Sequence, residues 1–76
     1  MYTTYQATND NYLLVPRALA ILRNGGNVML FPGGRALVCN RGGTVKKCLY
    51  PRDVARVLTA CRLVQSWPSH SLYVMR

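Results

Sequence analysis

Residues 27–50 read NVMLFPGGRALVCNRGGTVKKCLY, and this stretch decides the fold. Three apolar segments, residues 27–31, 35–40 and 44–50, alternate with the pairs Gly33-Gly34 and Gly42-Gly43. Glycine supplies the positive φ that tight hairpin loops need, and short apolar runs between such turns are typical of strands. The pattern predicts a three-stranded antiparallel meander.

The segment before the meander predicts a helix over residues 16–24. Pro16 suits the first helical position, and Gly25-Gly26 is a stop signal. The residue before a proline is pushed out of the α region, so Val15 should be extended. Residues 1–11 are polar and predict an irregular arm, which leaves residues 12–76 as a single domain.

A second helix is predicted over residues 51–66, because Pro51 and Asp53 suit its first turn. One face of this helix would be apolar, formed by Val54, Val57, Leu58, Cys61 and Val64. The opposite face would carry Arg52, Arg56 and Arg62, with Leu63 and Trp67 beside them. Alternation over residues 71–75 predicts a fourth strand. The expected class is α+β, one small domain of order α-β-β-β-α-β with the meander packed against the helices.

This order resembles the layout of double-stranded-RNA-binding domains, which carry basic residues at the start of their second helix. Arg52 and Arg56 would occupy comparable places. The lysine-rich helix signature of those domains is absent, and a fourth strand is added, so the likeness is one of layout and not of family.

The charge predicts an anionic partner. The chain has ten basic residues, eight of them arginine, and two acidic residues, which gives a net charge of +8. Soluble surfaces usually mix both signs, whereas arginine suits phosphate and carboxylate. Alternating loops should gather Arg23, Arg41 and Lys46 at one sheet end, and Arg35 and Arg52 at the other. The candidate contacts to nucleic acid or an acidic protein surface are Arg23, Arg35, Arg41, Lys46, Lys47, Arg52, Arg56 and Arg62.

Leu63 and Trp67 are candidate docking residues, because tryptophan beside arginine suits base stacking or a protein interface. The alternative for Trp67 is that it folds back to cap the thin core.

Catalysis is not expected. His70 is read as a solvated surface residue, and Asp53 as a helix-dipole residue. Cys39, Cys48 and Cys61 fall within apolar patterns and are read as reduced, buried thiols. No metal site, cofactor or membrane span is indicated, and a cytoplasmic location is expected.

Three functions remain, the third of them a basic ribosome- or ribonucleoprotein-associated structural protein, which would usually carry more lysine and a longer tail. The first is a small basic, non-catalytic protein that binds nucleic acid mainly through phosphate-directed Arg and Lys side chains. The second is a small virus- or plasmid-type regulator or inhibitor that docks by protein–protein contact on a nucleic-acid-handling enzyme or complex. Self-association stays open under each hypothesis.

Overall fold

The meander is confirmed. The computed structural model describes residues 11–76, and in it β2 (Asn27–Leu30), β3 (Ala36–Cys39) and β4 (Lys46–Leu49) pair antiparallel in chain order. Gly33 and Gly34 both have φ of +95° in the β2–β3 turn, a conformation that residues with a Cβ rarely adopt. The glycine pair therefore forms the predicted turn for the predicted reason.

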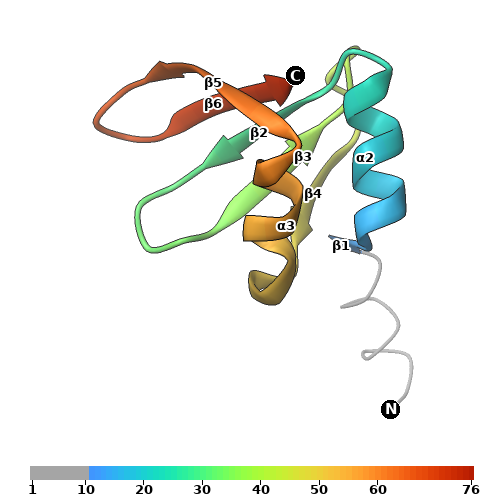
Figure 1. Ribbon diagram of the computed structural model, residues 1–76, viewed down its shortest axis with the longest axis horizontal. Helices are drawn as coiled ribbons and strands as arrows, with labels where there is room; N and C mark the ends of the chain where they lie inside the picture. Colours follow the sequence, from blue (N-terminus) through green and yellow to red (C-terminus); the bar gives the residue numbers. More distant parts are fainter. Residues whose placement is uncertain (1–10) are drawn as a thin grey trace.

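The sheet is wider than the meander. The predicted C-terminal strand is β6 (Ser71–Met75), which pairs antiparallel with β2. The apolar run before the first helix contributes a further strand, β1 (Tyr12–Leu13), parallel to β4. Within residues 11–76, six strands lie in the order β1-β4-β3-β2-β6-β5, so the protein is an α+β domain with a mixed, mostly antiparallel sheet (Figure 1).

The second helix is much shorter than predicted. A 3-10 turn, η1 (Pro51–Asp53), leads into α3 (Val54–Thr59), and the chain then forms β5 (Cys61–Ser66). The prediction that residues 61–66 are helical is wrong. β6 leaves a free edge beyond β2, and β5 pairs with that edge as an antiparallel hairpin. Strand pairing across this edge overrides a local helical periodicity.

The first helix, α2 (Val15–Arg23), begins one residue before the predicted start. Val15 is helical and not extended as expected; the extended residue is Leu14, with φ −80° and ψ 160°. Helix α2 ends in a Schellman motif, in which the Gly25 N–H donates to the Leu22 carbonyl and the Gly26 N–H donates to the Ile21 carbonyl.

Both helices pack on the same face of the sheet (Figure 1). Leu22 of α2 and Val57 of α3 are buried against Val28 and Val38 of the central strands. Strand alternation turns the other side of the sheet, including Met29, away from both described helices. Within residues 11–76 no helix has the length and apolarity to cross a membrane.

Most of the predicted arm at residues 1–11 lies outside the described residues. The layout likeness to double-stranded-RNA-binding domains does not extend to the second helix, because α3 is six residues long and is followed by a two-stranded hairpin.

Candidate nucleic-acid interface

Among the charged side chains of the described surface, nearly all are cationic. Asp53, the only acidic side chain within residues 11–76, is 8% exposed. Every predicted basic contact except the half-buried Lys47 is exposed. An anion approaching the described part of the chain therefore meets positive charge with almost no acidic side chain to oppose it.

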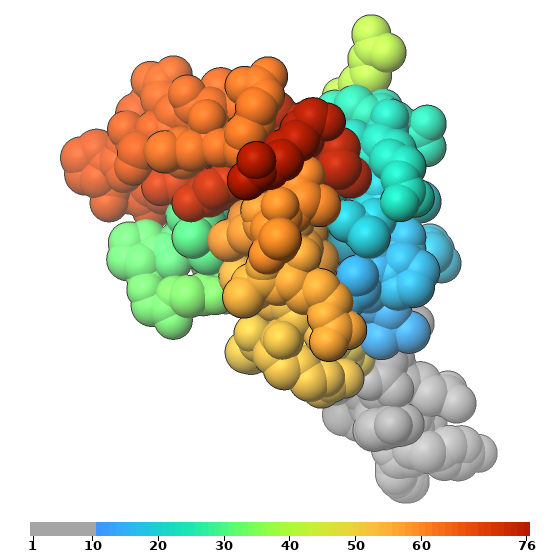
Figure 2. Space-filling model, in the orientation of Figure 1, coloured from blue at the N-terminus to red at the C-terminus, as the bar shows by residue number. Residues whose placement is uncertain are grey.

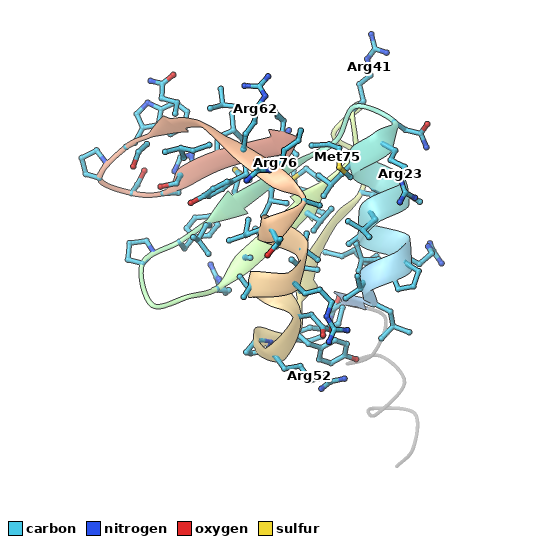
Figure 3. All side chains as sticks on the ribbon, viewed as in Figure 1. Arg23, Arg41, Arg52, Arg62, Met75 and Arg76 are labelled. Atoms are coloured by element: carbon cyan, nitrogen blue, oxygen red, sulfur yellow. The ribbon has the colours of Figure 1, made fainter. Side chains whose placement is uncertain are left out.

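The predicted division of charge between the two sheet ends is confirmed. Figure 3 shows Arg23 and Arg41 at one end and Arg52 at the opposite end. A Cβ on Gly25 would lie 3.1 Å from Cδ of Arg41, so the helix exit and the β3–β4 loop lie together. Lys46 begins β4 beside this loop. Arg35 precedes β3 at the other end, where its carbonyl accepts a hydrogen bond from the Phe31 N–H.

A line of aromatic rings lies at the Arg35 end of the sheet. The ring centroids of Phe31 and His70 are 5.6 Å apart, and those of His70 and Trp67 are 4.7 Å apart. The Arg35 guanidinium extends the line, with Cζ 5.2 Å from the Phe31 centroid. We call Phe31, His70 and Trp67 the ring array. It joins the end of β2 to the β5–β6 turn, which lie side by side in Figure 2.

The ring array lines a surface pocket of about 190 Å³, completed by Leu30, Pro32, Pro68 and Ser71. The pocket walls are mostly rings, which suits a flat, apolar, π-rich group. A second pocket, of about 290 Å³, lies between Tyr12, the Gly33-Gly34 turn and Pro51, and Arg35 lines it too. Arg35 thus lies over the Phe31 ring of the ring array and also lines the second pocket.

A second set of stacked groups lies at the β1 and β4 ends of the sheet. The rings of Tyr12 and Tyr50 stack with centroids 4.7 Å apart, and the Arg52 guanidinium lies 4.7 Å from the Tyr50 centroid. Arginine held over an aromatic ring keeps its outward N–H groups available to an anion. Each of the two sets of stacked rings therefore ends in a guanidinium group, Arg35 on Phe31 and Arg52 on Tyr50.

The face of the sheet opposite the helices is apolar at its centre and basic at two margins. Leu72, Met29, Leu37 and Cys48 are successive cross-strand partners, and all are half-buried. The next cross-strand line has basic residues at both margins, Arg62 opposite Val74 and Lys46 opposite Cys39. This face therefore carries half-buried apolar residues at its centre and one cation at each of two margins.

The predicted basic helix face does not form. Arg52 lies in η1, Arg56 in α3 and Arg62 in β5, so no single helix presents all three. Lys47 stands opposite the fully buried Val38, on the helix-covered side, whereas Lys46 stands on the other side of the sheet.

Leu63 and Trp67 are exposed, at 53% and 39%, but on a strand and its turn rather than on a helix. Trp67 packs against His70, and the core-capping alternative is not what the structure has. His70 is half-buried between two rings, so its reading as a simply solvated residue is wrong. Sequence reasoning missed Phe31, which is read locally as the last residue of an apolar strand.

The cysteines are placed for packing. Cys39 and Cys61 are 5% and 2% exposed, whereas Cys48, predicted to be buried, is half-buried on the face opposite the two described helices. Burial raises the pKa of the Cys39 thiol, opposed by the nearby Lys46 charge. Burial likewise raises the pKa of Cys61, opposed by Arg76. Both thiols therefore stay protonated at neutral pH, a form that is a poor nucleophile.

Guanidinium groups suit phosphate by their chemistry, and aromatic rings suit flat apolar groups. No known protein family, curated protein or solved structure matches the chain, so the candidate interface rests on its own geometry.

Proposed function

We propose that this protein is a non-catalytic nucleic-acid-binding module that acts mainly through phosphate contacts of its arginine and lysine side chains. The observation that carries the proposal is the single sign of the exposed charge within residues 11–76, since every predicted basic contact except Lys47 is exposed while Asp53 is 8% exposed. Arg35 and Arg52 are the contacts best prepared for phosphate, because each guanidinium is already held over an aromatic ring. Such holding reduces the side-chain entropy lost on binding.

The salt dependence of binding tests this function. Anisotropy of a labelled oligonucleotide should give an affinity that falls linearly with salt concentration on logarithmic axes. Replacing Arg35 and Arg52 together by glutamine removes two contacts and should reduce the slope by about 1.4 on single strands, at ~0.7 per phosphate. The matched variant with lysine at both positions keeps the charge and should keep the slope. Affinity that does not change with salt would overturn the proposal.

A second candidate, docking on a protein, is favoured by one feature of β5. This strand is at the edge of the sheet, and Leu63 and Val64 are 53% and 47% exposed on it. Exposed apolar edge strands are surfaces on which other chains pair or pack. A purified partner whose binding survives nuclease treatment and is lost in Leu63→Asp would favour this candidate. Retention of binding by that variant would exclude β5 as the docking strand.

A further inference from the structure

We infer that the protein prefers a single strand of nucleic acid, with one base inserted in the pocket of the ring array and the next phosphate at Arg35. This inference rests on the proposed function and adds its substrate class. The starting observation is the pocket of about 190 Å³, walled by Phe31, Trp67 and His70. Ring faces in a basic setting bind bases by stacking, irrespective of sequence.

The position of Arg35 relates the pocket to the charge. Its guanidinium lies 5.2 Å from the Phe31 centroid, so a phosphate bound there adjoins a base stacked in the pocket. Arg35 also lines the neighbouring pocket of about 290 Å³, beside the Gly33-Gly34 turn. A Cβ added at Gly33 or Gly34 would meet nothing within 4 Å, so the turn leaves open space for a strand to pass from one pocket to the other.

The geometry discriminates against a duplex. The bases of a duplex are stacked on each other and present only their edges in the grooves, so a base can enter the pocket lined by Phe31, His70 and Trp67 only after it is unstacked. A single strand already exposes base faces. The basic residues at the far end, such as Arg41, can hold phosphates of either form and so contribute affinity without this preference.

Trp67 is the single tryptophan of the chain and lies in the pocket, so its fluorescence reports on occupancy directly. The probes are oligo(dT), oligo(rU), an abasic deoxyribose-phosphate strand of equal length, and a duplex of equal length. Oligo(dT) should quench Trp67 emission, and the abasic strand should bind with little quenching. The single strands should bind more tightly than the duplex at equal salt.

Two variants localise the effect. Phe31→Leu keeps an apolar side chain but removes one ring wall, and it should weaken oligo(dT) binding by about 5- to 150-fold, the range for one base–aromatic stack. His70 lies at the β5–β6 turn, and the variant His70→Ala is a second test if Phe31→Leu fails to fold. Leu14→Ala, at a side chain that is 58% exposed and outside the pocket, is the matched control and should bind like the unmodified protein.

The outcomes separate the two claims. Equal affinity for the abasic strand, the duplex and oligo(dT), with unchanged Trp67 emission, would overturn the base pocket and leave phosphate binding standing. Binding of none of these probes at low salt would overturn the proposed function, and this inference with it. Quenching by oligo(dT) that both Phe31→Leu and His70→Ala weaken would support the inference.

Discussion

Gly26→Ala should destabilise the fold strongly, because this glycine, just after α2, leaves no room for a Cβ between α2 and β3. A Cβ at Gly26 would lie 2.5 Å from the Cys39 carbonyl oxygen, 2.6 Å from Cγ2 of Ile21 and 2.8 Å from the Ile21 carbonyl oxygen. Two of these three atoms belong to the backbone, so a side-chain rotation cannot relieve the overlap. The helix exit and the strand have to separate, which also weakens the Gly26 N–H bond to Ile21.

The size of the effect follows from the kind of clash. Forcing one extra carbon into a packed site costs about 1–3 kcal/mol, and a backbone clash belongs at the upper end of that range. A 76-residue domain is stable by only about 4–11 kcal/mol. A loss of roughly 2–3 kcal/mol should lower the midpoint of thermal unfolding by about 10–20 °C.

Gly42→Ala is the matched control for this substitution. Gly42 has no positive φ, and a Cβ there would meet nothing within 4 Å. Loss of glycine entropy in the unfolded chain should leave this variant unchanged or more stable by about 0.4–1 kcal/mol. Denaturant unfolding followed by circular dichroism measures both variants. Gly26→Ala as stable as the unmodified protein, or an equal loss in Gly42→Ala, would refute the close approach of α2 and β3.

Two further predictions concern the core and its thiols. Leu22→Ala, at 2% exposure, should cost about 2–5 kcal/mol of unfolding free energy. Leu63→Ala, at a side chain that is 53% exposed, should change the unfolding free energy by no more than about 0.5 kcal/mol. A similar loss in Leu22→Ala and Leu63→Ala would contradict the assigned burial. Burial raises the pKa of the Cys39 and Cys61 thiols in the folded protein. The contribution of these two thiols to folding stability should therefore be fully present below the unfolded-state pKa of about 8.5, and it should fall as the pH rises above that value. Unfolding titrations across this pH range should show the fall in unfolding free energy in the unmodified protein. If the same fall occurs in a variant with both thiols replaced by alanine, the thiols do not cause it.

Local sequence signals were sufficient for the meander, for α2 and for the division of charge between the two ends. Gly33-Gly34 and the helix stop at Gly25-Gly26 act through backbone conformation within a few residues, which a sequence displays directly. The position of Arg41 near Gly25 followed from the alternation of loops in a meander. The residues proposed to contact phosphate were therefore mostly accessible to sequence reasoning, although their binding remains a prediction.

The sequence alone determined that this is a small, basic α+β domain, because period, turn chemistry and composition are local properties. Only the tertiary structure decided that residues 61–66 form a strand, since Val57, Cys61 and Val64 also fit one helix face and the choice depends on the free edge of β6. The ring array depends on that choice. With β5 in the sheet, the β5–β6 turn carries Trp67 and His70 to Phe31, a residue more than thirty positions earlier in the chain. No local pattern encodes such a contact, because it exists only when β6 pairs with β2.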